Sequence, residues 1–113
     1  MTWNVYDNNG NVKETVSPLR YNNRTISSTT TLATGDYLVF LSTGAAFTVN
    51  LPTAVGNAGM QLIMVDATGT SNTNNVTVDA NGSETIDGAL TYVINIPFEA
   101  LSIVSNGTNW IAT

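Results

Sequence analysis

The chain has 113 residues and a formal net charge of −5, and it contains neither cysteine nor histidine. The absence of cysteine excludes disulfides, thiolate metal sites and cysteine nucleophiles. The absence of histidine removes the commonest general base at neutral pH and the commonest metal ligand, so the composition argues against an enzyme.

The charges are unevenly distributed along the chain. All the basic residues lie in the first 24 positions, namely Lys13, Arg20 and Arg24. From Thr25 onward the chain holds only acidic charges, at Asp36, Asp66, Asp79, Glu84, Asp87 and Glu99. A body without positive charge cannot neutralise phosphates, and no apolar run approaches the ~20 residues that span a bilayer. We therefore expect neither nucleic acid nor a membrane as a partner.

The first 24 residues are predicted to form a separate N-terminal arm. The stretch "TWNVYDNNGNVKETV" is typical of a β-hairpin whose turn is Asn8–Asn11, and the loop "SPLRYNNR" follows it. Interfaces are enriched in aromatic and arginine side chains, so we expect this arm to dock on a partner. The alternative is an ordinary edge hairpin packed on its own domain. The predicted docking residues are Trp3, Tyr6, Lys13, Arg20, Tyr21 and Arg24.

Residues 25–113 are predicted to form one β domain. Short apolar runs separated by Asn, Thr, Ser and Gly favour strands over helices, with at most one helical turn near residues 52–57. Residues 47–51 and 76–78 alternate between apolar and polar side chains, as strands with one buried face do.

Two strands are apolar on both faces, "YLVFL" at 37–41 and "LIMV" at 62–65. A two-layer sandwich with a solvated outer side does not require this pattern, so a second subunit is one way to cover the outer face. The residues predicted to lie in the core or in a subunit interface are Tyr37, Val39, Leu41, Ile63 and Val65.

The remaining strands are expected at 91–96, 100–104 and 109–112, with turns at 67–75, 80–83 and 105–109. Short strands separated by turn signals predict an all-β fold: an antiparallel β-sandwich, jelly-roll-like, with an N-terminal β-hairpin arm. Trp110 lies on the last of these strands. We expect it to be a core residue with its N–H on a nearby carbonyl rather than a sugar-stacking platform.

The most acidic stretch is "DANGSETIDG", at residues 79–88. A regular calcium loop that starts at Asp79 needs glycine at its sixth position and glutamate at its twelfth, but the chain has Glu84 and Leu90 there. An irregular calcium site at Asp79, Asn81, Glu84 and Asp87 stays open as an alternative.

The same stretch also has a simpler interpretation as two tight turns. Asn81-Gly82 and Asp87-Gly88 are pairs that supply positive φ angles, with a short strand and an inward Ile86 between them. We therefore predict turns and no metal site. Glu84 and Asp87 also meet the minimum of two carboxylates for a glycosidase, which remains a minor alternative.

An ordered set of motifs from Thr29 to the C-terminus resembles a module of bacteriophage virion proteins, which include head fibres, capsid-decorating proteins and tail fibres. The matching pieces are a threonine-rich lead into "DYLVFL", a strand ending in "LP", "GMQLIM", "NGSETIDG" and a closing "SNGTNW". The resemblance covers about three-quarters of the chain. It implies a compact, jelly-roll-like homotrimer without catalytic residues, and we expect no cofactor.

The resulting hypothesis is a virion protein of this kind, a capsid-decorating or head-fibre-type accessory protein that docks on other virion proteins through its N-terminal segment. The alternative is a tail-fibre or adhesin module that binds host-surface glycans.

Overall fold

A computed structural model of the chain describes residues 3–6, 8–10, 12–16 and 20–113, with side chains described for 8–10 and 20–113. These residues form β-strands and no helix. Within them, therefore, no helix is long and apolar enough to cross a membrane. The strands are Trp3–Tyr6 (β1), Val12–Val16 (β2), Asn23–Ile26 (β3), Thr30–Thr31 (β4), Leu38–Leu41 (β5), Phe47–Asn50 (β6), Gln61–Asp66 (β7), Val76–Asp79 (β8), Thr91–Ile94 (β9), Ala100–Ser105 (β10) and Trp110–Ala112 (β11).

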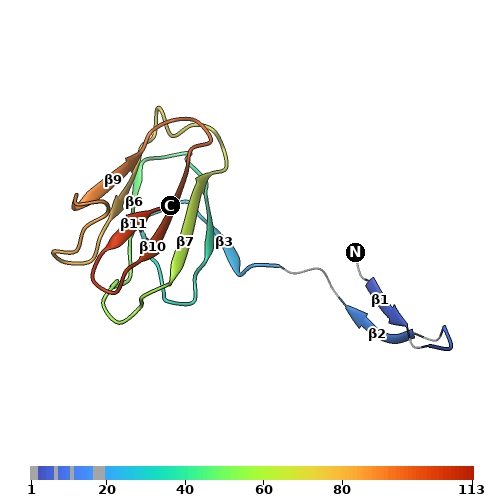
Figure 1. The fold of residues 1–113 in the computed structure, drawn as a ribbon. Helices are drawn as coiled ribbons and strands as arrows, with labels where there is room; N and C mark the ends of the chain where they lie inside the picture. Colours follow the sequence, from blue (N-terminus) through green and yellow to red (C-terminus); the bar gives the residue numbers. More distant parts are fainter. Residues whose placement is uncertain (1–2, 7, 11, 17–19) are drawn as a thin grey trace.

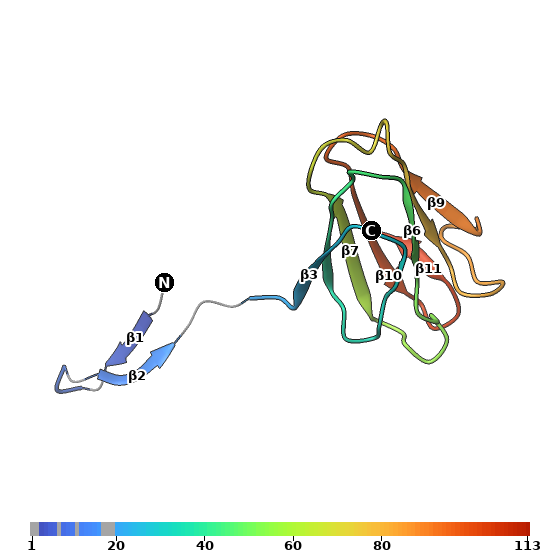
Figure 2. The same cartoon turned by 180° about the vertical axis from the view of Figure 1, so that it is seen from behind.

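The strands from β3 onward form two sheets that face each other (Figure 1). One sheet has five strands in the order β11-β10-β7-β5-β3, and the other has four in the order β4-β6-β8-β9. Strands β1 and β2 form an antiparallel pair of their own, which Figure 2 shows separate from the two larger sheets. The domain boundary predicted at residue 24 falls inside β3, so Asn23 and Arg24 pair with the five-stranded sheet.

The all-β prediction is confirmed, but the expectation of an antiparallel sandwich is wrong. The pairs β3–β5, β5–β7, β4–β6 and β6–β8 are parallel, and both sheets are therefore mixed. The cause lies in the connections. From β3 to β8 each short connection carries the chain into the opposite sheet, so every second strand returns to the same sheet in the same direction. We call such a connection between the two sheets an arch. Turn residues alone do not distinguish an arch from a hairpin, which joins two neighbouring strands of one sheet.

Other local expectations have mixed outcomes. The turn at 105–109 is a true hairpin connection, between the antiparallel strands β10 and β11. Residues 52–57 contain no helical turn. Two successive tight turns occur there instead, closed by the bonds from the Asn57 N–H to the Ala54 carbonyl and from the Met60 N–H to the Asn57 carbonyl.

The core lies between the two sheets and draws on both. Its fully buried side chains alternate with half-buried ones along β5, β6, β7 and β8, as the period of a strand requires. Trp110 is 0% exposed, which confirms its predicted core position. The carbonyl partner predicted for its indole N–H is not found, because this group makes no hydrogen bond to the described residues.

The outer faces of the two sheets differ in chemistry. On the five-stranded sheet, Leu38 pairs with Ile63 and Phe40 pairs with Val65, and all four side chains are only half-buried. On the four-stranded sheet, the corresponding outward pairs are Thr48 with Thr77 and Asn50 with Asp79. The outer face of the five-stranded sheet is therefore apolar along β5 and β7. The outer face of the other sheet is polar along β6 and β8, with the exposed side chain of Val93 on β9 next to Thr77.

Candidate functional site

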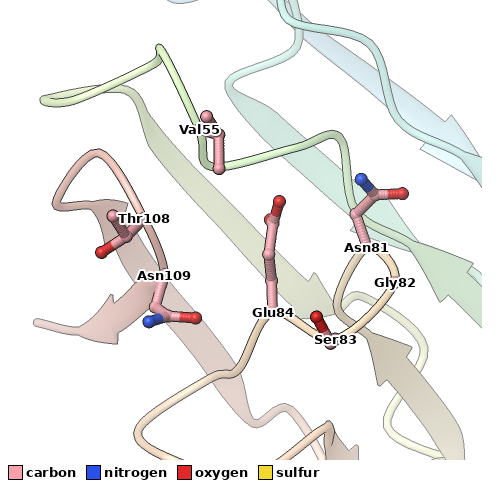
Figure 3. Close-up of a pocket in the computed structure, with 7 residues that line it drawn as sticks. All are labelled: Val55, Asn81, Gly82, Ser83, Glu84, Thr108 and Asn109. Carbon is pink, nitrogen blue, oxygen red and sulfur yellow. The ribbon is translucent and has the colours of Figure 1, made fainter.

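The candidate site is an open depression of about 410 Å³ at the edge of the β-sandwich. Three connections line it: the one between β6 and β7, the one between β8 and β9, and the turn between β10 and β11. The lining residues are Val55, Asn81, Gly82, Ser83, Glu84, Thr108 and Asn109 (Figure 3).

Glu84 joins two of these connections. One carboxylate oxygen accepts a hydrogen bond from the Thr53 hydroxyl at 2.6 Å, and the other accepts one from the Ala54 N–H at 2.7 Å. Figure 3 shows the side chain between Asn81 and Asn109. The carboxylate therefore holds the β8–β9 connection to the β6–β7 connection, and both of its oxygens are already engaged by the protein.

Asn109 fixes the opposite side. Its side-chain oxygen accepts a hydrogen bond from the Thr85 N–H at 2.9 Å, and its own N–H donates to the Asn106 side chain at 2.9 Å. Trp110 adds a further bond between these two segments, because its backbone N–H donates to the Thr85 carbonyl at 2.9 Å. The β10–β11 turn is thus held against the β8–β9 connection.

The free hydrogen-bonding groups of the depression are uncharged. Asn81 and Ser83 are exposed, and neither side chain bonds to a described residue. No basic residue lines the depression, and Glu84 is its one acidic residue. With free amide and hydroxyl groups beside the exposed side chain of Val55, this surface suits a neutral, hydroxyl-rich ligand better than an anion.

The predicted tight turns are present in residues 79–88. Asp87 and Gly88 have φ angles of 49° and 86°, and Ile86 and Ala89 exchange backbone hydrogen bonds across them, which is the type I′ arrangement. In the other turn only Gly82 has a positive φ, 56°, and the Glu84 N–H bonds to the Asn81 carbonyl at 3.0 Å. Ile86 is buried as predicted, although it forms isolated bridges rather than a strand.

The four residues of the irregular calcium hypothesis do not converge. Glu84 is occupied by Thr53 and Ala54, and Asp87 accepts a hydrogen bond from the Ala112 N–H at 2.9 Å. Within the described residues, no group of three or more acidic side chains is placed to hold a metal ion. The clustering in sequence therefore does not become a cluster in space.

A second polar cluster was not predicted from the sequence. Asp66, at the end of β7, is fully buried and accepts six hydrogen bonds. The donors are the side chain of Thr43, both donor groups of Thr68, and the backbone N–H groups of Gly69, Ser71 and Phe98. Burial alone would raise the pKa of Asp66, but hydrogen bonds from Ser71, Gly69 and Thr43 hold that pKa well below its ordinary value.

This buried carboxylate also accounts for an unusual backbone conformation. Phe98 has a φ of 62°, which is rare for a bulky residue, and its N–H donates to Asp66 at 3.1 Å. The ring of Phe98 lies over Gly69, where an added Cβ would be 2.5 Å from it. The cluster thus fastens the β7–β8 connection to the one between β9 and β10.

The predicted docking residues are only partly described. The side chains of Trp3, Tyr6 and Lys13 lie outside the described part of the chain. Arg20 is exposed, and Tyr21 is 57% exposed with its ring 4.8 Å from that of Tyr37. Arg24 is exposed and forms an ion pair with Asp36 at 2.9 Å.

The residues predicted for the core or a trimer interface separate into two groups. Val39 and Leu41 are 0% exposed and belong to the core. Tyr37, Ile63 and Val65 are half-buried, and Ile63 and Val65 lie on the apolar outer face of the five-stranded sheet.

Sequence comparisons add no family to this description. No protein-family model matches the chain, and no curated protein has a matching sequence.

Proposed function

We propose that the protein is a non-enzymatic structural component of a bacteriophage virion, a homotrimeric capsid-decorating or head-fibre-type accessory protein anchored through its N-terminal segment. Its place among jelly-roll-like virion modules is part of the proposal and rests on the sequence resemblance described above. The partner surfaces would be two further copies of the chain and another virion protein.

The observation that carries the proposal is the apolar outer face of the five-stranded sheet. Leu38, Phe40, Ile63 and Val65 form adjacent pairs on it. Val104 and Ile111 form a further apolar pair, with Gln61 opposite Val104 and Ser102 opposite Ile63. A soluble monomer rarely exposes a contiguous apolar surface, whereas closed symmetric oligomers bury such faces. The outer face of the other sheet provides the contrast, because its outward side chains on β6 and β8 are polar.

The charge distribution supports anchoring through the N-terminal segment. Arg20 is exposed and makes no ion pair with a described residue, whereas Arg24 is held by Asp36. From Thr25 onward the chain has no basic residue. The first 24 residues also contain Asp7 and Glu14, so their formal charge is +1, against −6 from Thr25 onward. An acidic partner surface would therefore repel the body and favour contact through the N-terminal segment.

Binding to empty capsids tests this anchoring. The truncation should remove residues 1–20, because Asn22 accepts a hydrogen bond from the Leu38 N–H and β3 begins at Asn23. We expect the full chain to bind capsids stoichiometrically and the truncated chain to stay trimeric but lose binding. Arg20→Gln should weaken binding, while Asp79→Asn, a charge change on the body, should not. Equal binding by the truncated chain would contradict the proposal.

A second candidate function, a tail-fibre or adhesin module, is favoured by the depression beside Glu84. Its free groups, at Asn81 and Ser83, are those that hydrogen-bond to the hydroxyls of neutral sugars. Binding of the isolated protein to host cells, or to neutral oligosaccharides in a glycan screen, would support this function over capsid decoration.

The matched variants are Asn81→Ala, in the depression, and Asn95→Ala, an exposed asparagine in the β9–β10 connection. Only the first should abolish glycan binding. If both variants bind as the parent chain does, the depression is not the glycan site.

A further inference from the structure

The chain has three Asn-Gly pairs, at residues 9–10, 81–82 and 106–107. Glycine after asparagine permits an intramolecular reaction, because no Cβ hinders the approach of the glycine nitrogen to the asparagine side chain. The sequence alone does not separate these pairs. The structure does so for the two in the body, Asn81-Gly82 and Asn106-Gly107.

At the first pair, both reacting groups are free. Asn81 is exposed and its side chain bonds to no described residue. Gly82 is exposed, and its N–H makes no hydrogen bond within the described residues. The space around Gly82 is open, since an added Cβ would meet nothing within 4 Å.

At the second pair, both groups are held. The side-chain oxygen of Asn106 accepts hydrogen bonds from the N–H and hydroxyl of Thr108, each at 3.0 Å, and from the Asn109 N–H at 2.9 Å. The Gly107 N–H donates to the Ser105 hydroxyl at 3.0 Å, and Ser105 is buried. The carboxamide is therefore fixed in one orientation, and the nitrogen must give up a hydrogen bond before it can react.

We propose that Asn81 is a site of spontaneous deamidation in the folded protein and that Asn106 is protected by its hydrogen bonds. The Gly82 nitrogen, after losing its proton to hydroxide, attacks the side-chain carbonyl carbon of Asn81. A bond forms between these two atoms, the bond from that carbon to Nδ2 breaks, and the nitrogen leaves as ammonia after taking a proton from water. Water then opens the cyclic imide at either carbonyl to give aspartate or isoaspartate, and no atom is oxidised or reduced.

The product changes the candidate site. It places a new carboxylate on the rim of the depression that Glu84 occupies, and it makes the formal net charge one unit more negative than −5. The isoaspartate form also lengthens the backbone in the turn that the Glu84 N–H closes on the Asn81 carbonyl. Ageing of the protein would thus alter this surface while the turn at Asn106 stays intact. This inference does not depend on the proposed function.

The test is incubation of the full chain at mildly alkaline pH, followed by peptide mass spectrometry. Trypsin cannot separate the two sites, because the last basic residue is Arg24. A glutamate-specific protease cuts after Glu84 and Glu99, and so places Asn81 and Asn106 in different peptides. We expect Asn81 to convert several-fold faster than Asn106 in the folded chain.

Two controls complete the test. In denaturant the two rates should converge, because both sites are Asn-Gly and the folded protection of Asn106 is lost. Asn81→Gln should remove the fast conversion, because a longer side chain closes the ring far more slowly. Conversion of Asn106 at or above the rate of Asn81 in the folded chain, or a fast phase that persists in Asn81→Gln, would overturn the proposal.

Discussion

Asp66 is the residue on which three connections of the molecule depend. Its two oxygens accept all six of its hydrogen bonds as a carboxylate, from the Thr43 hydroxyl in the β5–β6 connection, from the β7–β8 connection and from the N–H of Phe98. An amide at this position keeps the shape but replaces one acceptor atom by a donor that faces N–H groups. The buried N–H and hydroxyl groups that donate to the replaced carboxylate oxygen would then lack an acceptor.

We therefore expect Asp66→Asn to lower the free energy of unfolding by about 2–4 kcal/mol, as the loss of a buried hydrogen-bond network does. Denaturant unfolding at neutral pH measures this change. Asp79→Asn is the matched control, because Asp79 is half-buried on the outer face of β8 and makes no hydrogen bond through its side chain to a described residue. A loss as large in the control would contradict the role assigned to Asp66.

The pH dependence follows from the lowered pKa of Asp66. Its folded-state pKa lies below the unfolded value of about 3.9, so its stabilising contribution is complete above that value and is lost as the pH falls toward the folded pKa. The stability difference between the parent chain and Asp66→Asn should therefore be constant near neutrality and shrink below about pH 4. A stability difference that grows as the pH falls would contradict this assignment, because it would mean that folding raises the pKa of Asp66.

Asp66 also illustrates what the sequence could not predict. Its partners at 43, 68–71 and 98 are far apart in the chain, and only the arrangement of the arches brings them together. A single aspartate after the apolar run 62–65 looks like the end of a strand. The sequence also could not predict that the Asn106 side chain is hydrogen-bonded while that of Asn81 bonds to no described residue, because both residues are followed by glycine.

At the scale of elements, most strands from β5 onward were predictable and their neighbours were not. Strands β3 and β4 were not predicted, and the first two residues of β3 lie in a segment predicted to be a loop. The alternation in residues 47–51 and 76–78 placed β6 and β8 correctly, because side chains on a strand alternate between faces whatever the pairing. The direction of pairing depends on where each connection takes the chain. The short links before and after β5 look like hairpin turns in sequence but lead to the opposite sheet.

The two faces of the five-stranded sheet predict different outcomes for the same substitution. Val39→Asp places a carboxylate in the core, where Val39 is 0% exposed, and should prevent folding. Ile63→Asp places it on the half-exposed outer face and should leave a folded monomer that no longer assembles. Circular dichroism and light scattering together distinguish these outcomes.

Thr77→Asp on the outer face of the other sheet is the control for assembly. It should leave both fold and mass unchanged. An Ile63→Asp chain that retains the mass of the parent assembly would mean that the apolar face is not the subunit contact.

At the scale of the whole molecule, the prediction concerns mass in solution. A small β domain with one apolar outer face gains stability when copies cover that face, so we expect a trimer at micromolar concentration. Its melting temperature should then rise with protein concentration. Sedimentation equilibrium gives the mass, and a monomer with a concentration-independent melting temperature would exclude the proposed assembly.

The alternation of the chain between the two sheets has a consequence for folding kinetics. Neither sheet is a contiguous stretch of sequence, so neither can form before most of the chain is in place. Pairs such as Ile63 with Ser102 and Leu38 with Ile63 close loops of tens of residues. Domains dominated by such distant contacts fold in milliseconds to seconds. The body should therefore fold slowly for its size and unfold in a single cooperative transition, because from β3 to β8 the strands of the two sheets alternate along the chain.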